Sequence, residues 1–557
     1  MIGIKAMAEK KKKKDFDPAR MGRTADIVAT VFAVYMLVIY ACWMHNKYFD
    51  ITGTRADVFL EGTGFFVIIF AMAYFFEYSL AQYYEMRLPL IYRDTRLVLQ
   101  PAVWMGLFLL ANVAAFLMAP DKKAAWTGSE GRRFGLFMVC MLFLMVLALT
   151  RGVRLPGWII YVAALMAILA AVMAVIQHFG VDIFYLRRDI KVKQQQKFIS
   201  FFGNLNTYAS YLAMVIPFFW SLFVFTNKKC RRILAGVTLF VLAAGILPSK
   251  SDNIYICLFV TGILLLFLAL RKGRILEWTA VICILSAGLY LMAVLTVKYN
   301  GSKKHLNGMA EKLENGKLLL LAFLFFAFLF AGLFLLRRMK PAVYEKLSGK
   351  SVSLILAAVL AAGFLGVIII LRKSGSDLVK FNDKWGTFRG YIWRRSVSLF
   401  KAGSPLQKIF GHGNETVRRL MNDAYYEEMT RITKQTYDNC HNELLQYLVT
   451  TGLFGMISYI GFFITSVLFI LKKGFAIWHK PAGEKLVKTK EEKNRQADET
   501  AAEERSETET TVAAVALGMA AVGYFAQELV NLNQPITTPY YFFAAALGVG
   551  LIRKISK

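Results

Sequence analysis

Acidic residues are scarce in this 557-residue sequence: 37 Asp and Glu are outnumbered by 67 Lys and Arg, for a net charge of +30. On a soluble protein this excess would suggest a nucleic acid partner. Here, however, 57% of the residues are hydrophobic and the mean hydropathy is +0.47. The apolar residues form runs of roughly 16 to 24 with almost no cation inside them, as in membrane spans. We therefore expect an integral membrane protein that binds no nucleic acid.

Cysteine is also scarce, and its placement excludes two kinds of site. The six cysteines are scattered, and none forms a metal-type or disulfide-type spacing with another Cys or His. A carboxylate pair at defined spacing, an Asp-x-Asp metal motif and a glycine-rich phosphate loop are lacking too. Nucleotide-sugar and ATP chemistry are therefore unsupported. We expect no disulfide framework, no metal ion and no cofactor.

The apolar segments predict the number of spans and their orientation. No cleavage site follows the basic N-terminus, so the first segment should remain as an anchor. With that N-terminus in the cytoplasm, the alternating loops on the same side carry 37 of the 67 cations. This bias predicts that both termini are cytoplasmic. About fourteen segments lie near residues 27–45, 62–82, 98–119, 134–150, 156–177, 205–226, 233–248, 252–270, 276–297, 318–336, 352–371, 441–471, 511–530 and 536–552.

The predicted fold class is all-α: a polytopic integral membrane protein of about fourteen transmembrane helices with a large ordered extracytoplasmic loop. Between Pro481 and Thr511 the chain has no aromatic residue and only Leu486 and Val487 as large aliphatics, so it cannot form a core. The predicted organisation is a cytoplasmic N-terminus (1–26), a bundle of about eleven helices (27–371), the loop (372–440), a transmembrane helix (441–471), a disordered cytoplasmic linker (472–510), and two helices with a short cytoplasmic tail (511–557).

The long loop, residues 372–440, carries thirteen cations and seven acids although it is predicted to face away from the cytoplasm. Its aromatic residues alternate with charge, which favours an ordered segment that packs on the bundle. The stretch RGYIWRRSVSLFK places Ile392, Trp393, Val397 and Phe400 on one helical face. This pattern is typical of a helix at the membrane interface, or of a structural amphipathic cap. The excess of cations indicates that the loop meets something anionic.

Two further features lie on the same predicted side. Asn204 and Asn206 occur where the sixth span should begin, and an exposed helix N-terminus can bind phosphate, although a plain helix cap is the alternative. His441 opens the twelfth predicted segment in DNCHNELLQYLVTTGLFG. A histidine can act as a general base near neutral pH, whereas a structural role at the helix entry is the alternative.

Three stretches in order resemble the O-antigen ligase and polymerase superfamily. They are FGNLNTYASYL, RGYIWRRSVSLFKAGSPLQKIFGHG and HNELLQYLVTTGLFG, and the likeness covers roughly residues 195–471. The resemblance implies an all-helical polytopic glycosyltransferase that needs no metal ion. It also implies that an outer-face loop joins a sugar, carried on a polyprenyl diphosphate, to an acceptor hydroxyl.

The resemblance assigns roles to individual residues. The family's arginine ahead of tryptophan corresponds to Arg389, and its His-Asn pair corresponds to His441 and Asn442. A second family arginine corresponds to Lys250, which keeps the charge but lacks the planar fork that grips a diphosphate. By this resemblance His441 deprotonates the acceptor, Arg389 stabilises the leaving diphosphate, and the anomeric carbon is inverted. Further expected diphosphate-binding residues are Arg187, Arg188, Arg394, Arg395, Asn204, Asn206, Asn442 and Lys250.

The expected partners are an undecaprenyl-diphosphate-linked glycan donor, a glycan or lipid-linked acceptor, and the lipids of a bacterial cytoplasmic membrane. Polymerase and ligase activity both remain open, because the two differ only in the acceptor. A flippase for polyprenyl-linked glycans is the alternative of another class, but we find neither duplicated halves nor many charges inside the spans. A glycan polymerase of the shape-and-division type would require an essential outer-loop Asp, which cannot be placed.

Overall fold

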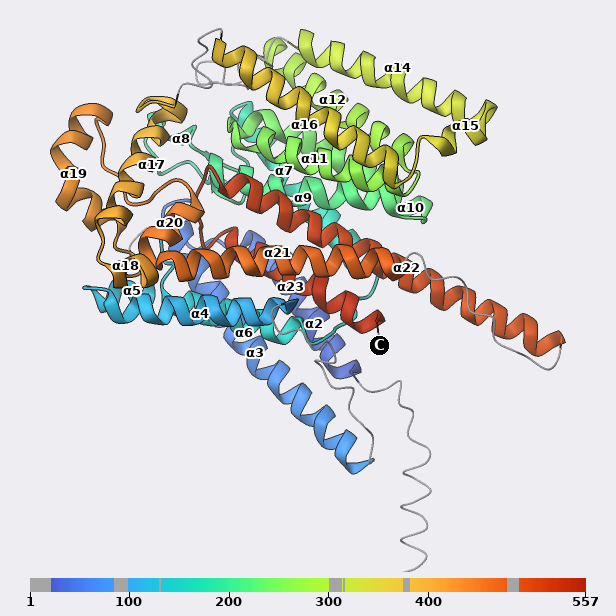
Figure 1. The fold of residues 1–557 in the computed structure, drawn as a ribbon, viewed down its shortest axis with the longest axis horizontal. Coiled ribbons are helices and arrows are strands. Elements are labelled where there is room, and N and C mark those ends of the chain that lie inside the picture. Colours follow the sequence, from blue (N-terminus) through green and yellow to red (C-terminus); the bar gives the residue numbers. More distant parts are fainter. Residues whose placement is uncertain are drawn as a thin grey trace, which may run out of the picture.

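The computed structural model describes residues 22–84, 99–129, 132–299, 313, 316–373, 381–477 and 490–556. Nearly all of the regular secondary structure in this part of the chain is helical (Figure 1). The strands among the described residues are β1 (Phe198–Ile199) and β2 (Gly203–Asn204), which pair antiparallel. The predicted all-α class of a polytopic membrane protein is confirmed.

Eleven helices within the described residues are long and apolar enough to cross a membrane. They are α2 (Arg23–Val34) continued by the π-helix η2 (Tyr35–Tyr40), α3 (Ile51–Tyr83), α4 (Pro101–Met118), α7 (Ile159–His178), α9 (Leu205–Phe225), α10 (Lys229–Ile246) with its 3-10 extension Leu247–Ser249, α11 (Asn253–Arg271), α12 (Ile275–Lys298), α14 (Lys317–Met339), α21 (Gly452–Ile477) and the second part of α22 (Lys490–Glu528). The helices α6 (Leu136–Leu149), α16 (Lys350–Lys373) and α23 (Thr538–Ile555) cover the remaining predicted segments. The count of about fourteen spans therefore stays a prediction.

The predicted helix over residues 441–471 is two helices, α20 (Glu443–Thr450) and α21. The break lies at Gly452, whose φ of +67° is left-handed. A Cβ at Gly452 would lie 2.3 Å from the carbonyl oxygen of Ile409, so only glycine fits this close approach. The backbone N–H groups of His412 and Gly413 then bond to the end of α20, each at 3.0 Å.

Residues 381–440 of the long loop form helices at one end of the bundle. These are α17 (Trp385–Ala402), α18 (Pro405–Phe410) and α19 (Val417–Thr433), and they gather with α5 (Lys122–Thr127) and α8 (Val192–Gln195) (Figure 1). We call this the loop end. A separate hydrophobic core holds the loop helices together, formed by Tyr391, Ile392, Leu399, Val417, Met421, Met429, Tyr437, Cys440 and Val449.

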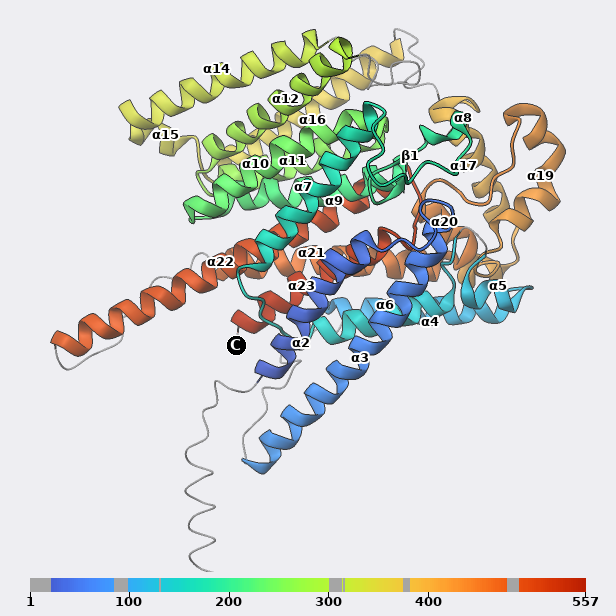
Figure 2. The same cartoon turned by 180° about the vertical axis from the view of Figure 1, so that it is seen from behind.

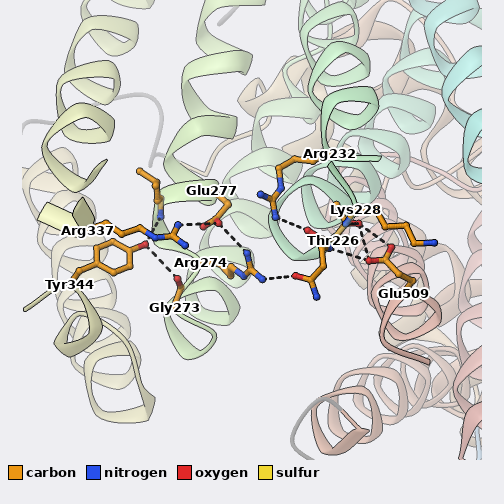
Figure 3. Close-up of polar contacts among 11 residues, drawn as sticks. Thr226, Lys228, Arg232, Gly273, Arg274, Glu277, Arg337, Tyr344 and Glu509 are labelled. Carbon is orange, nitrogen blue, oxygen red and sulfur yellow. Dashed lines mark hydrogen bonds and ion pairs between the residues drawn. The ribbon is translucent and has the colours of Figure 1, made fainter. Parts of the chain in front are cut away.

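The start of α2, the end of α23 and α15 (Pro341–Lys346) lie at the opposite end, which we call the terminal end (Figure 1). Lys554 on α23 pairs with Asp26 on α2 at 3.2 Å. Polar contacts also join the end of α9, the starts of α10 and α12, the end of α14 and the middle of α22 here (Figure 3). Glu277 is central to them, since it pairs with Arg274 at 3.1 Å and with Arg337 at 3.5 Å. Which end faces the cytoplasm stays a prediction.

The predicted disordered linker, residues 472–510, differs from the structure. Helix α21 continues to Ile477, residues 478–489 lie outside the described part, and α22 begins at Lys490. Low apolar content argues against a hydrophobic core, but helix formation does not require one. The stretch is rich in Ala, Glu, Lys and Arg, which have high helix propensity and can extend a helix that is anchored by its buried second half. Residues 1–21 of the predicted N-terminal segment also lie outside the described part.

Candidate functional site

A cavity of about 1170 Å³ lies at the loop end. Its wall is built from the start of α3, the residues ahead of α6, the segment from β1 to α9, the first part of α17, residues 435–441 and the connection between α22 and α23. Seen from behind, α17, α20, β1 and the start of α3 lie at this same end (Figure 2). The fold therefore turns side chains that are far apart in the sequence toward one polar space.

Arg389 lines the cavity immediately after a break in α17. Gly386, Thr387 and Phe388 have φ values of 58°, 57° and 70°, and three left-handed residues in succession interrupt the helix. Nη1 of Arg389 donates to the carbonyl oxygen of Gly386 at 3.2 Å, while its buried Nε has no partner among the described residues. A guanidinium with unused donors in a cavity wall is suited to bind an anion.

The Arg389 guanidinium is partly desolvated. Burial lowers its pKa, and the negative charge of Asp252 opposes that shift. Arginine nevertheless remains a cation at physiological pH because its ordinary pKa is so high. Arg389 therefore supplies a fixed positive charge to the cavity.

His441 lines the same cavity from the turn that precedes α20. Its φ of 47° is left-handed. Its backbone N–H donates to Oδ1 of Asn439 at 2.9 Å, and its carbonyl oxygen accepts from Nε1 of Trp393 at 3.4 Å. These bonds fix the backbone, whereas no residue in the described ranges hydrogen-bonds to a ring nitrogen. The position of the backbone is thus fixed, and the unprotonated ring nitrogen is available to accept a proton.

Burial of the His441 ring, and then the positive charges of Arg389 and Arg132, lower its pKa to about 4. The imidazole is consequently neutral near pH 7, which is the form that can accept a proton. Arg132 in turn forms an ion pair with Asp438, with Nη2 to Oδ1 at 2.8 Å. Burial alone would raise the pKa of Asp438, but the hydrogen bond and charge of Arg132 outweigh it and hold that pKa at about 2.

The first turn of α9 forms the floor of the cavity. Asn204 is the N-cap of α9, and its Oδ1 accepts from the Asn206 N–H at 2.8 Å, so the predicted cap is present. Oδ1 of Asn206 accepts from the hydroxyl of Ser251 at 3.1 Å, and Oε1 of Gln534 accepts from the hydroxyl of Thr207. Each amide oxygen is therefore occupied. The nitrogens Nδ2 of Asn206 and Nε2 of Gln534 have no partner among the described residues and remain available as donors in the cavity wall.

The structure brings four of the predicted site residues into this cavity: Arg389, His441, Asn204 and Asn206. Lys250 does not line it but occupies the adjacent turn between α10 and α11, next to Ser251. Lys250 has a left-handed φ of 50°. Burial, then the charge of Arg187, lower the Lys250 pKa to about 8. Its charge contributes to the potential near Asn206 without forming part of the wall.

The other predicted residues do not line the cavity, and within the described part of the chain all but Arg188 have side-chain contacts of their own. Nη1 and Nε of Arg187 donate to the carbonyl oxygens of Gln177 and Phe198 at 2.9 and 3.0 Å, and Arg188 is exposed. Arg394 pairs with Asp383, and Arg395 pairs with Glu428 while lying over the rings of Tyr391 and Tyr425. Asn442 caps α20 through Leu445 N–H and donates to the carbonyl oxygen of Leu529 at 2.7 Å.

Sequence reasoning missed two parts of the cavity. Two ion pairs connect the segments of the wall: Arg132 with Asp438, and Arg133 with Asp57 at 2.5 Å. Gln534 adds an amide donor to the wall. The isolated Gln534 in QPITTP carries no motif. Only the fold places it beside Thr207.

Fold and site together define a multi-pass membrane protein with a cation-bearing polar cavity at one end of a helical bundle. Residues 313–460 match the family model described as O-antigen ligase. The matched range begins just before α14 and ends in α21, so it includes Arg389 and His441 but not Asn206 or Gln534. The resemblance to the O-antigen ligase and polymerase superfamily is thereby confirmed, and it supports a membrane glycosyltransferase of that type. No curated protein matches the sequence.

Proposed function

We propose that this protein transfers a glycan from undecaprenyl diphosphate to an acceptor hydroxyl at the extracytoplasmic face of a bacterial cytoplasmic membrane. The observation that carries the proposal is the convergence of Arg389 and His441, both from the matched range, with Asn206 and Gln534 in one cavity. The loop end is the outer face in this proposal, and both termini are cytoplasmic, as the distribution of cations predicts.

The proposed reaction uses a neutral histidine and fixed donors. A ring nitrogen of His441 takes the proton of the acceptor hydroxyl as its oxygen attacks the anomeric carbon. The bond from that carbon to the phosphate oxygen breaks, and the electron pair leaves with the polyprenyl diphosphate. Arg389 stabilises the charge that develops there, and the amide N–H groups of Asn206 and Gln534 donate to the phosphate oxygens. Attack opposite the leaving group inverts the anomeric carbon.

The proposed reaction uses no metal ion, because a guanidinium and amide groups meet the charge of the leaving group. Lys250 adds positive potential from the next turn, while Arg187, Arg394, Arg395 and Asn442 support the segments that form the cavity.

The test compares Arg389 with a matched arginine of the same helix. Purified Arg389→Ala and His441→Ala should lose glycan transfer in proteoliposomes, and Arg394→Ala, whose partner is Asp383 outside the cavity, should retain it. Transfer by Arg389→Ala at the rate of the wild type would overturn the proposal. In a deletion strain, a single repeat unit accumulating on the polyprenyl carrier indicates a polymerase, whereas full-length chains indicate a ligase.

A further inference from the structure

A second cavity, of about 650 Å³, lies among α2, α7, α9, α22 and α23, and most of its wall is apolar. Its lining residues recur every three or four positions on α22 from Ser506 to Ala520 and on α23 from Tyr540 to Leu551. One face of each helix therefore borders the cavity. At 1.5 Å per residue these stretches are about 16 to 21 Å long. We call this elongated cavity the slot.

Small side chains leave the slot open. Alanines 33, 163, 513 and 544 contribute to its wall from four different helices. Larger side chains at these positions would fill the space, and the helices would then pack directly against one another. An apolar space of this length is suited to a hydrocarbon chain.

The end of the slot nearest the terminal end is polar and cationic. Arg231 pairs with Glu509 at 2.8 Å, and Glu509 also accepts from the hydroxyl of Thr226 at 3.0 Å and from the N–H of Asn227 at 3.1 Å. The carboxylate is therefore balanced by Arg231. Lys228 adds a second cation to the slot wall, and its ammonium has no ion pair among the described residues; Figure 3 shows its side chain beside this group.

The position of the cations in the slot favours an occupant other than the glycan donor. The slot places its cations at the terminal end, whereas Arg389 and His441 lie at the loop end. A donor whose diphosphate reaches Arg389 cannot place a charged group beside Lys228. The length of the slot instead matches one leaflet, which is half of the roughly 30 Å hydrocarbon core of a bilayer.

We propose that the slot binds one acyl chain of an anionic phospholipid from the leaflet at the terminal end, with the lipid phosphate beside Lys228. The bound chain fills the space that the small residues leave between α2, α7, α22 and α23. The lipid is then a structural ligand of the bundle. This inference does not depend on the proposed glycan transfer.

The experiment is native mass spectrometry of the full-length protein purified in detergent, with extraction and identification of the retained lipid. Phosphatidylglycerol and phosphatidylcholine with identical chains are then added back in turn. The wild type should retain one phospholipid and prefer phosphatidylglycerol. Lys228→Gln should reduce that preference about fivefold, since one cation near a lipid surface contributes a factor of this size. Lys229→Gln, the exposed neighbour outside the slot, should not change it.

A second pair of variants tests the chain itself. Ala163→Phe places a ring in the slot and should abolish lipid retention, whereas Leu165→Phe, on the exposed face of the same helix, should not. Size-exclusion chromatography checks folding. If Ala163→Phe cannot be purified, the comparison of Lys228→Gln with Lys229→Gln tests the proposal alone. The proposal is overturned if the wild type retains no phospholipid or a polyprenyl phosphate, if both added lipids bind equally, or if folded Ala163→Phe retains the lipid.

Discussion

His441 should control the pH dependence of glycan transfer, with an inflection well below the usual range of histidine. The pKa of the imidazole is about 4 because the ring is buried and faces the charges of Arg389 and Arg132. The neutral form is the base, so activity should rise as pH increases through about 4 and be level near pH 7, apart from ionisation of the diphosphate. An unperturbed histidine would instead give an inflection near 6.5.

Variants of Arg132 and Asp438, which form an ion pair beside His441, test the direction of the shift in the His441 pKa. Arg132→Gln removes a positive charge and leaves Asp438 unpaired, so the cationic form of His441 is stabilised and the inflection should move to higher pH. Asp438→Asn removes the negative charge that opposes the shift, so the inflection should move lower. Neither residue is placed among the groups that contact the reacting atoms.

The assay is transfer from a lipid-linked donor in proteoliposomes, followed from about pH 3.5 to about pH 8. His441→Ala should lose about 100-fold to 10,000-fold in rate, which is the usual range for a general base, and its residual activity should lack the inflection. Donor binding should persist. Thermal unfolding at each pH controls for loss of fold. An alanine variant with the pH profile of the wild type, or a shift in the same direction for both ion-pair variants, would refute the assignment of His441 as the base.

Further outcomes follow from the cavity and the orientation of the bundle. Arg389→Ala should reduce transfer about 100-fold to 1,000-fold, with little recovery in Arg389→Lys, because lysine cannot reproduce the planar fork. Gln534→Ala should weaken binding of farnesyl diphosphate about tenfold and Gln534→Glu more, while Thr207→Val, which only frees the amide oxygen, should have a smaller effect; equal effects of all three would indicate a purely structural contact. A cysteine at Ala402 on α17 should react with an impermeant thiol reagent on intact cells, and one at Ala342 on α15 should not; the reverse would invert the topology. EDTA should leave transfer unchanged.

The hydrophobic pattern was enough to predict the fold class and the approximate positions of the helices. Two local errors have physical causes. The break at Gly452 depends on a close approach of the chain at Ile409, which no periodicity reveals. The helix from Lys490 was mistaken for a disordered linker because hydropathy reports core formation and does not report helix propensity.

Residues that line the cavity could be predicted where the chain carries a motif, but not where only packing brings residues together. Arg389 and His441 belong to stretches with a recognisable order, and the cavity contains both. Arginines 187, 394 and 395 have the right chemistry, but the fold assigns their guanidinium groups to backbone carbonyls and carboxylates. A charge count cannot distinguish an arginine that is paired within the protein from one that is left for a ligand.

Gln534 illustrates the converse case. It lies 145 residues beyond Arg389 in the sequence, outside the matched range, in a short connection between two helices. The hydroxyl of Thr207 holds its amide oxygen, and this contact requires α9 and α22 to lie side by side, as they do in the bundle. The donor that results is therefore a property of the helix packing. If the variants of Gln534 behave as expected, the C-terminal helices contribute directly to the site as well as to the membrane anchor.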